Sequence, residues 1–427
     1  MKKILNEIDA YIHGQKIGTL IEHEGTIFFE YDKNFQTSGL EISPLKLNTK
    51  TTTGLYTNRD NTYLYGGMPG VFFDSLPDKY GMAFIDRYFE SRGLRLSQIS
   101  LLYKLAFIGD RGMGAIEYRP REHEESDDIQ SALSAKDAYE NMKKILDGKE
   151  ASCSIASLMN IIDSVSPIGG GRPKMLIAYN AKNNTIQFNT RKLDAGYKRA
   201  LIKFDEIYYA HESMDFTKLE YVYMQMAKEC GIKTPPFTLY EEEGQFHLVV
   251  ERFDRDENDH KIHMCTAAGL MHKDISVPKT MSYEELFLFA TKMCKNQATV
   301  EQLFKRMVFN ALSVNYDDHA KNFSFIMNEQ GEWDLSPAYD ITYSKGLAQE
   351  HITTINGKGK AFVLDDFLLI AQNNLIKKST ALKIIEQVVE TLRHFEQRAK
   401  EVEINSKLIE ECKEDIDEQL ALLGSGG

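Results

Sequence analysis

The segment SVNYDDHAKNF, residues 313–323, brings carboxylates, an imidazole, an ammonium group and a carboxamide close together along the chain. Within it, Asp317 and Asn322 are separated by four residues. Phosphoryl transfer uses this spacing, because one carboxylate orients a substrate hydroxyl and accepts its proton while an amide oxygen one loop turn away binds a metal ion. The spacing therefore predicts Asp317 as a catalytic base and Asn322 as a Mg²⁺ ligand. His319 and Lys321 are secondary candidates for the same site.

A second metal ligand is expected after a turn in the chain. The stretches FSFIM (323–327) and WDL (333–335) flank the turn NEQGE and predict a β-hairpin, which closes on SPAYD (336–340). The hairpin returns Asp340 to the neighbourhood of Asn322. A carboxylate in this place is suited to a second metal contact. We therefore predict Asp340 as a second Mg²⁺ ligand.

A site of this kind also needs a cation and a flexible turn for the phosphates of ATP, and both are found upstream. The strand-like stretch ALIKFD (200–205) contains Lys203, and the amphipathic helix that follows carries Glu220, which can pair with this lysine. The stretch SPIGGGRPK (166–174) is a turn whose backbone N–H groups can approach phosphate closely. Its glycines are Gly169, Gly170 and Gly171.

The base of the nucleotide is expected at the junction between two parts of the chain. VVERFDR (249–255) follows a β-rich stretch and precedes a helical one, so its backbone is placed to contact an adenine edge. Glu251, Phe253 and Asp254 are the candidates here. Each of these features alone also fits a turn, a cap or a solvated surface residue. Their order along the chain favours a kinase site.

The elements that must position these residues divide into a β-rich and an α-rich region. Residues 150–255 alternate strand patterns with turns and indicate an antiparallel meander followed by one helix. Residues 256–427 show helical periodicity for most of their length. Residues 1–118 are mixed, with a helix over 78–93, and 119–149 are a charged connector and a helix. We predict an α+β, bilobed protein-kinase-like fold with an additional N-terminal mixed α/β subdomain and an all-α C-terminal lobe.

Length and composition exclude several classes of protein. At 427 residues, with 42% hydrophobic and 27% charged residues, the chain has the composition of a folded protein of about two or three domains. The 51 basic and 63 acidic side chains give a formal charge of −12, which disfavours direct binding to DNA. Five dispersed cysteines without a CxxC spacing argue against disulfides and a zinc ribbon. No stretch is long and apolar enough to span a bilayer, so we expect a cytoplasmic protein with no membrane partner.

Together these motifs resemble those of the HipA-type serine/threonine kinases, the toxins of bacterial toxin–antitoxin pairs. The resemblance is carried by DDHAKNFSF with LSPAYD, by VVERFDR, IKFD and GGGRPK, and by FIGDRGMGAIEY at residues 107–118. It covers nearly the whole chain and implies ATP and Mg²⁺ as cofactors. The roles that it implies are a catalytic base for Asp317, Mg²⁺ binding for Asn322 and Asp340, phosphate contact for Lys203, and the adenine hinge for Glu251 with Phe253.

The resemblance also implies regulation and partners. In the family, autophosphorylation of a serine in the glycine-rich loop ejects the loop and silences the enzyme. The nearest serines here are Ser166 and Ser164, although Pro167 and the GGG run alter the local pattern. Known members are held by a small helix-turn-helix antitoxin that binds DNA, and they phosphorylate aminoacyl-tRNA synthetases. We therefore expect an antitoxin, only indirect contact with DNA, and a protein substrate whose identity the fold does not transfer. Asp318 stands where the family varies, which favours Asp317 as the base.

The sequence leaves two other functions open. One is a metallohydrolase or zinc protein built on HKIHMC (260–265) with His272 or with DDH (317–319), although the spacing fits no HExxH or CxxC pattern. The other is a catalytically inactive HipA-like binding module or co-repressor. Stoichiometric zinc would favour the first, and Mg²⁺-dependent ATP binding would favour a kinase. Incubation with labelled ATP separates an active kinase from an inactive one.

Overall fold

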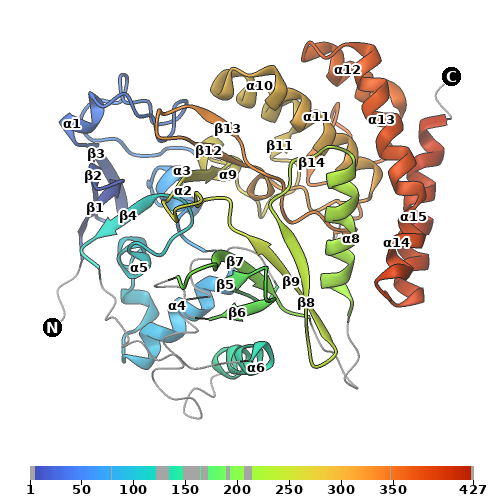
Figure 1. Cartoon of the computed structure of the whole chain (residues 1–427). Coiled ribbons are helices and arrows are strands. Elements are labelled where there is room, and N and C mark those ends of the chain that lie inside the picture. The colour runs from blue at the N-terminus through green and yellow to red at the C-terminus, as the bar shows by residue number, and fades with distance from the viewer. Residues whose placement is uncertain are drawn as a thin grey trace.

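The computed structural model of the chain describes residues 5–77, 79–121, 134–147, 164, 172–188, 193–205, 214–346 and 348–424. Its elements form an N-terminal sheet with short helices, a separate five-stranded sheet, and a mostly helical C-terminal part (Figure 1). Among the helices in these ranges, none combines the length and the apolar composition that crossing a membrane requires.

The N-terminal part is built on an antiparallel sheet in the order β3–β2–β1–β4. Two-residue turns join its first three strands, and both residues of each turn have positive φ: 48° and 79° at His13 and Gly14, and 50° and 76° at Glu24 and Gly25. Turns of this kind match the twist of the strands, and glycine adopts the conformation without strain. Local sequence therefore sets this pairing. The strands are β1 (Glu7–Ile12), β2 (Gln15–His23), β3 (Thr26–Tyr31) and β4 (Ile116–Arg119).

Short helices connect β3 to β4 and bury aromatic side chains against the sheet. The ring centroids of Phe29 on β3 and Phe72 lie 4.8 Å apart. The helix predicted over 78–93 is confirmed as α4. The elements of this connection are α1 (Lys33–Gln36), α2 (Thr62–Tyr65), α3 (Gly70–Phe73), α4 (Lys79–Ser91), the 3-10 helix η1 (Leu96–Gln98) and α5 (Leu101–Ile108).

The second part is an antiparallel five-stranded sheet in the order β6–β5–β7–β9–β8. The predicted meander is wrong in its strand order, because β7 pairs with β5 rather than with β6. Every residue of β5 is buried, so its backbone groups need a neighbouring strand on each side. The strands are β5 (Lys174–Asn180), β6 (Thr185–Gln187), β7 (Lys198–Lys203), β8 (Phe237–Glu242) and β9 (Gln245–Glu251). Helix α8 (Phe216–Glu229) follows β7 and packs against β8 and β9.

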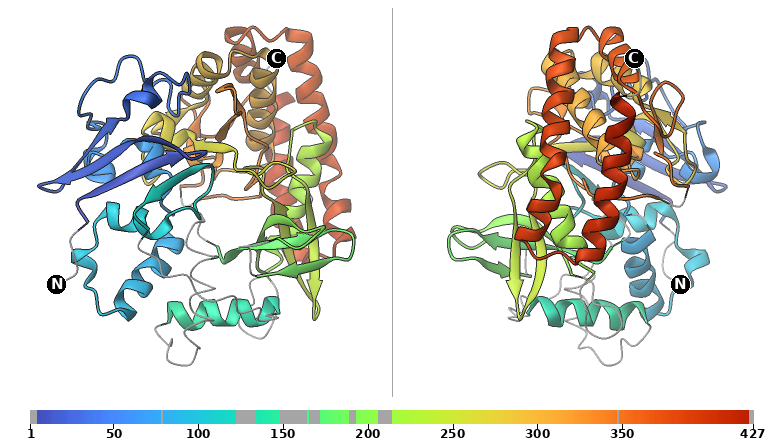
Figure 2. Two further views of the ribbon diagram at one scale, coloured as in Figure 1. Left: turned by 60° about the vertical axis from the view of Figure 1, so that its left-hand side comes forward. Right: turned by 90° about the vertical axis from the view of Figure 1, so that its right-hand side faces the viewer.

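Helices that precede the five-stranded sheet in the chain cover one of its faces. Helix α6 (Ala135–Leu146) lies beneath the sheet in the left view of Figure 2. Met142 of α6, Ile177 of β5 and Phe89 of α4 belong to one buried hydrophobic cluster. Because α4 comes from the N-terminal part, this cluster joins the first part of the molecule to the second.

The third part is mostly helical, as the periodicity of its sequence predicts. Its longest helical stretch is divided at His394, whose ψ of 7° departs from helical geometry. The helices are α9 (Ala267–Met271), α10 (Tyr283–Cys294), α11 (Gln297–Leu312), α12 (Leu364–Asn373), α13 (Lys378–Arg393), α14 (Phe395–Glu401) and α15 (Ser406–Gly424). Figures 1 and 2 show α13, α14 and α15 as an outer wall on the side away from the N-terminal sheet.

Two small sheets lie among these helices. The predicted hairpin is confirmed as β12 and β13, with Phe325 opposite Leu335. The lobe predicted as all-α is therefore helical around short strands, because β12 also pairs with β10. The first sheet contains β10 (His263–Thr266), β12 (Ser324–Met327) and β13 (Trp333–Leu335), and the second pairs β11 (Met281–Ser282) in parallel with β14 (Thr353–Thr354).

The N-terminal part is docked tightly on the C-terminal part through α3 and α9. A Cβ on Gly70 would lie 2.1 Å from the carbonyl oxygen of Gly269, and a Cβ on Gly269 would lie 2.9 Å from that of Gly70. Beside this contact, Asp74 accepts hydrogen bonds from Thr266 N at 2.7 Å and from Thr266 Oγ1 at 2.6 Å. The two parts share the largest hydrophobic core of the molecule, so they are held as one body.

Candidate active site

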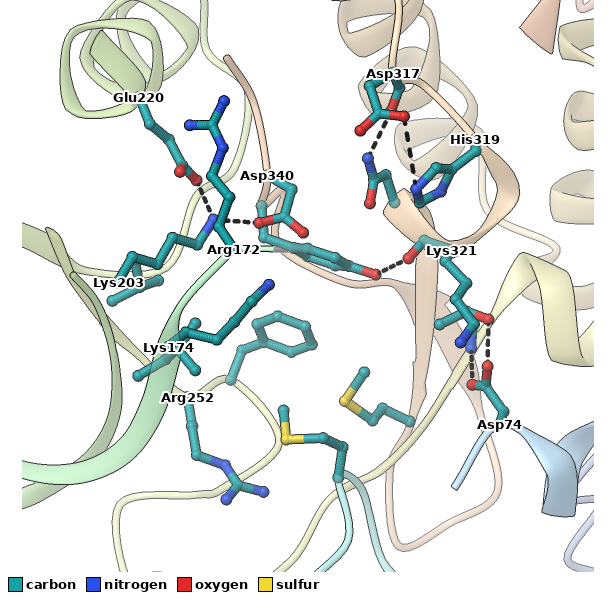
Figure 3. Close-up of a pocket in the computed structure, with 18 of the residues that line it drawn as sticks. Asp74, Arg172, Lys174, Lys203, Glu220, Arg252, Asp317, His319, Lys321 and Asp340 are labelled. Carbon is teal, nitrogen blue, oxygen red and sulfur yellow. Dashed lines mark hydrogen bonds and ion pairs between the residues drawn. The ribbon is translucent and has the colours of Figure 1, made fainter. Parts of the chain in front are cut away.

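A cavity of about 300 Å³ lies where the three parts of the molecule meet (Figure 3). This volume is at the lower end of the range for small-molecule sites. Segments far apart in the sequence supply its walls. They include Met113 and Ile116 from the N-terminal part, Leu201 and Lys203 from the five-stranded sheet, and Asp317, Asn322 and Asp340 from the C-terminal part.

Lys203 lies at the end of β7, and its ammonium group is buried between two carboxylates. Its Nζ donates to Glu220 Oε1 of α8 at 2.5 Å and to Asp340 Oδ1. Burial alone would lower the pKa of Lys203, but the two carboxylates raise it well above its usual value, so the side chain stays charged. We call Lys203, Glu220 and Asp340 the Lys203 cluster. The helix after β7 thus supplies an anionic partner for the strand lysine.

Asp340 presents an ionised carboxylate to the cavity. Burial alone would raise its pKa, but Lys203 and Lys174 hold that pKa well below the usual range. The backbone of Asp340 has a φ of 51°, in the left-handed region that aspartate adopts more readily than most residues. Backbone of this kind is concentrated at functional sites, where the surrounding structure holds it in place. Asp340 is therefore both charged and fixed in direction.

The loop that follows α11 is tied to the segment carrying Asp340. Tyr339 Oη donates to Lys321 O at 2.7 Å, which holds the two segments together. Within the loop, Asn322 Nδ2 donates to Asp317 O at 2.7 Å. Because the amide nitrogen of Asn322 is used in this bond, its oxygen is the atom left for a cation. Asn322 and Asp340 both line the cavity.

Asp317 is the more accessible of the two adjacent carboxylates. Its side chain is 52% exposed, and its Oδ1 lies 3.8 Å from His319 Nε2. Removal from water raises the pKa of Asp317, as do Asp340 and Asp318, while His319 opposes this rise. A raised pKa brings a carboxylate nearer to the range in which a general base works. Figure 3 shows Asp317 and His319 on one side of the cavity and Lys203 on the other, with Asp340 between them.

The segment after β9 crosses from the five-stranded sheet to the helical part. The N–H groups of Glu251 and Arg252 each donate to a carbonyl of a neighbouring segment at 2.9 Å. The ring of Phe253 stacks on Tyr339, with centroids 5.6 Å apart and planes 26° apart. Glu251 and Phe253 line the cavity. The segment 251–253 is therefore fixed both to the sheet and to the segment that carries Asp340.

Asp254 is fully buried and lies outside the cavity wall. Its carboxylate accepts from Arg252 at 2.6 and 2.8 Å, from Arg255 at 2.8 Å and from Gly114 N at 2.7 Å. Burial alone would raise the pKa of Asp254, but the two guanidinium groups hold it well below the usual range. We call Arg252, Asp254, Arg255 and the N–H of Gly114 the Asp254 cluster. It joins the segment after β9 to the N-terminal part, so its geometry does not direct this carboxylate at a nucleotide.

Sequence reasoning missed several residues that the cavity gathers. Arg172 and Lys174 add two cations beside Lys203 (Figure 3). Arg172 directly follows the glycine run and Lys174 is two residues further on, and basic residues after a turn predicted to bind phosphate were a usable signal. Met113 and Ile116 add apolar surface. The motif at 107–118 that contains these two carried the family resemblance but did not point to the cavity, because their place there depends on how the N-terminal part packs on the others.

The predicted glycine-rich turn falls largely outside the described residues, including Gly169, Gly170, Gly171 and Ser166. Ser164 is described and buried, and its Oγ donates to Phe188 O at 3.4 Å. The secondary candidates His319 and Lys321 both line the cavity.

The zinc alternative finds no ligand set in the described ranges, where no three His, Cys, Asp or Glu side chains are grouped so as to hold a metal ion. His260 Nδ1 lies 3.0 Å from Asp256 at the surface, His263 packs its ring against Trp333, and His272 Nδ1 lies 3.1 Å from a carboxylate of the N-terminal part. Magnesium bound together with ATP needs fewer protein ligands, because phosphate and water oxygens complete its coordination.

Comparison with known proteins assigns the family. The model of the HipA N-terminal domain matches residues 8–119, and the model of the HipA-like C-terminal domain matches residues 166–395. The chain belongs to the HipA family. The family expected from the sequence motifs is therefore confirmed.

Individual relatives of this HipA-family chain are named as kinases. It is 24% identical over 344 residues to the serine/threonine-protein kinase toxin HipA of Shewanella oneidensis, and the match covers 74% of this chain and 70% of that protein. It is 26% identical over 211 residues to a protein of Haemophilus influenzae that is named provisionally as a kinase. That match covers 42% of this chain and only 62% of the relative.

A solved structure confirms the predicted fold class. The structure of the Shewanella oneidensis HipA, determined with HipB and its operator DNA, matches this chain with a TM-score of 0.66. The match covers 97% of this chain and 96% of the other at 19% identity. The HipA-family chain thus has a kinase-like fold preceded by a further N-terminal part.

Proposed function

We propose that this HipA-family chain is a protein serine/threonine kinase that transfers the γ-phosphoryl group of ATP to a protein hydroxyl with the help of Mg²⁺. One observation carries the proposal. Lys203 contacts both Glu220 and Asp340 at a cavity that Asp317 and Asn322 also line. A strand lysine paired with a helix glutamate, next to a metal-binding aspartate and a base, is the set of groups that phosphoryl transfer uses.

The residues of the cavity fit ATP and Mg²⁺. Apolar walls at Leu201 and Met113 suit a purine ring, and the positive charges of Arg172 and Lys174 suit its phosphates. The ionised Asp340 and the amide oxygen of Asn322 are ligands of the kind that Mg²⁺ prefers. When bound, ATP supplies the phosphoryl group and Mg²⁺ neutralises charge that develops on it. Lys203 orients the phosphates, and the Glu251–Phe253 backbone borders the base.

Asp317 takes the part of the general base. It orients the acceptor hydroxyl and accepts its proton, which its raised pKa favours. The half-exposed position of its side chain lets a hydroxyl of another protein approach. His319 and Lys321 line the same side and are placed to contact the acceptor or the transferred group. Asp254 holds the hinge from behind and does not touch the nucleotide in this scheme.

The proposed kinase has four parts along the chain. Residues 1–118 form the HipA-type N-terminal subdomain, 119–149 the connector and helix, 150–255 the nucleotide-binding lobe and 256–427 the catalytic lobe. The glycine-rich turn with Gly169, Gly170 and Gly171 would cover the phosphates.

Inhibitory autophosphorylation of the glycine-rich turn is a further part of the proposal, with Ser166 and Ser164 as candidates. Ser164 is buried, so its modification requires the segment to leave the position described. Phosphopeptide mapping of purified protein after incubation with ATP identifies the modified residue.

The partners proposed are a small DNA-binding antitoxin and a protein substrate. The Shewanella oneidensis relative was solved with HipB and operator DNA, which supports an analogous partner here. The formal charge of −12 favours contact with DNA through such a partner rather than directly. An aminoacyl-tRNA synthetase is the first substrate to test.

The decisive test uses purified protein with radiolabelled ATP, with and without Mg²⁺, and an extract of the native host as acceptor. We expect Mg²⁺-dependent labelling, and Asp317→Ala should lower transfer on the order of 10³-fold while folding and ATP binding persist. His260→Ala serves as the control, because it alters the discarded zinc motif outside the cavity. Absence of labelling with wild-type protein would favour the inactive binding module.

A further inference from the structure

The two adjacent carboxylates of the DDH motif have opposite surroundings. The side chain of Asp317 is 52% exposed, whereas Asp318 is 1% exposed. Consecutive residues of a loop point in different directions, so only one of the pair can face the cavity. Asp318 is therefore a buried carboxyl group that the scheme of phosphoryl transfer above does not use.

Asp318 bonds to two segments that lie far from it in the sequence. Its Oδ2 accepts from Tyr283 Oη at 3.0 Å and from His351 Nδ1 at 2.9 Å. Its Oδ1 accepts from Thr353 N at 3.0 Å, and its carbonyl oxygen accepts from Thr353 Oγ1 at 2.5 Å. Tyr283 is the first residue of α10, His351 lies in the segment between Asp340 and β14, and Thr353 is the first residue of β14.

The partners of Asp318 depend on it in turn. In the described part of the chain, His351 Nε2 is buried without a hydrogen-bond partner, so the bond from Nδ1 to Asp318 orients the ring. Tyr283 Oη also accepts from Asn310 Nδ2 at 3.1 Å. A buried carboxylate with several donors is expensive to disturb, because each donor would lose its partner without gaining water.

Backbone hydrogen bonds extend the same connection. Ser344 N donates to Val314 O at 3.0 Å, Tyr316 N donates to Ser344 O at 2.8 Å, and Ile352 N donates to Tyr316 O at 3.1 Å. The loop that carries Asp317 is thus laid against the segment after Asp340 at several points. The carboxylate of Asp318 adds side-chain contacts to these backbone bonds.

The loop needs such a support because its backbone is strained. Val314 has a φ of 59°, a left-handed conformation that β-branched residues rarely adopt. Strained backbone persists only where surrounding contacts over-determine it. If the contacts of Asp318 were lost, the loop would be free to relax at Val314, and Asp317 would move with it.

We propose that Asp318 is a positioning residue, which locks the loop of Asp317 onto the segment 351–353 and so fixes the base relative to the nucleotide. The inference rests on the proposed kinase function. The proposal predicts that changes at Asp318 alter the rate of transfer and have little effect on nucleotide binding. The Lys203 cluster is not touched by the lock.

The test compares Asp318→Ala and Asp318→Asn with Asp366→Asn. Asp366 is a suitable control because it is also a buried carboxylate with several donors, including Lys358 Nζ at 2.8 Å, but it lies at the start of α12 away from the cavity. Transfer is measured per nucleotide-binding site, which removes any contribution from unfolded protein.

We expect Asp318→Ala to lower kcat about 100-fold with KM for ATP changed less than about threefold, because a small displacement of a reacting group has an effect of this size. Asp318→Asn keeps an acceptor for Thr353 N and should recover part of the loss. Asp366→Asn should lower the thermal midpoint and leave kcat unchanged. An unchanged kcat in Asp318→Ala, or an equal loss in Asp366→Asn, would overturn the proposal.

Hydrogen exchange supplies a readout that does not need activity. The amides of Tyr316, Ile352 and Thr353 should exchange faster in Asp318→Ala than in the wild type, with no change in α8. Continued protection of these amides would refute the lock even if the chain proves to be inactive. If exchange is accelerated in Asp318→Ala but the wild type transfers no phosphate, the kinase function is contradicted and the lock still stands.

Discussion

The Lys203 cluster and the Asp254 cluster have nearly the same chemistry and differ in where they face. Each has a carboxylate whose pKa is held low by cations against the effect of burial. The carboxylate of Asp340 is 32% exposed and lines the cavity, while that of Asp254 is fully buried. A perturbed pKa therefore indicates a candidate site only when the group also opens onto space that a ligand can fill.

The two carboxylates also differ in their backbone conformation and in the number of cations that each contacts. Asp340 carries its charge on a left-handed residue and shares Lys203 with Glu220, so more than one anion competes for a single cation. Asp254 has two guanidinium groups and a backbone N–H to itself. The side chains of the Lys203 cluster can therefore exchange partners when phosphate and metal bind. The Asp254 cluster should keep the same contacts.

The largest effect should come from Asp340→Ala, which removes the proposed metal ligand. We expect phosphoryl transfer to fall on the order of 10⁴-fold and nucleotide binding to lose its dependence on Mg²⁺. The fold should persist, because Lys203 keeps Glu220. Radiolabel transfer and nucleotide titrations with and without Mg²⁺ measure both effects. Asp334→Asn, on β13 shortly before Asp340 and outside the cavity, should behave as wild type. Normal transfer by Asp340→Ala would place the metal elsewhere.

Asp254→Ala should affect stability rather than chemistry. Removing this carboxylate leaves Arg252 and Arg255 buried without their anion, so the free energy of unfolding should fall by about 3–5 kcal/mol. Transfer per folded molecule should change little. Urea unfolding measures the free energy of unfolding. Transfer per folded molecule is measured by dividing the rate of transfer by the titrated number of active sites. Asp259→Ala, which breaks the more exposed pair with Arg199, should lose no more than about 1 kcal/mol. If the Asp254→Ala variant is stable but inactive, Asp254 takes a direct part in the active site.

Glu220→Gln should have a smaller effect, because Lys203 keeps Asp340. The neutral amide of the substituted side chain attracts the ammonium group of Lys203 less strongly than the carboxylate of Glu220 does. Lys203 is therefore held less firmly in the orientation that faces the phosphates. We expect kcat/KM for ATP to fall about tenfold, which corresponds to about 1.4 kcal/mol. Steady-state kinetics at several ATP concentrations measures it. Glu229→Gln, on the same helix but paired with Arg398 at the surface, is the matched control and should show no change.

The smallest effects should appear in the dependence of stability on pH. The pKa of Asp254 is lowered by folding, so its contribution to stability is present above about pH 4 and is lost as the pH falls further. The stability difference between wild type and Asp254→Asn should therefore shrink below pH 4.

The pKa of Asp317 is raised by folding, so the ionised form of this carboxyl group lowers the stability of the folded protein at neutral pH. Asp317→Asn should be more stable than wild type at pH 7 and lose that advantage toward pH 4. Urea midpoints from pH 7 to pH 3 test both slopes, and parallel curves would contradict them.

Much of the candidate site follows from local sequence. The interval between Asp317 and Asn322 sets the loop, and the β12–β13 hairpin returns the chain to Asp340. The order of strand and helix brings Glu220 to Lys203. These relations depend on turns and periodicity over short stretches, which residue types control directly.

Other features depend on contacts between distant segments. The pairing of β7 with β5 follows from which strand is buried on both faces, and the sequence pattern of a short apolar strand does not tell a central strand from its neighbour. Likewise, nothing in VVERFDR shows that Asp254 turns toward Gly114, which is 140 residues away.

By itself, the sequence determined which residue types stand in kinase order, the family to which they belong, and the mixed fold that carries them. Tertiary structure decided which of the charges face the cavity. Asp317 and Asp318 are adjacent and identical, yet one opens to solvent and the other is enclosed by α10, His351 and β14. The reason is that burial is a property of the surrounding surfaces, and those surfaces come from parts of the chain that only folding brings together.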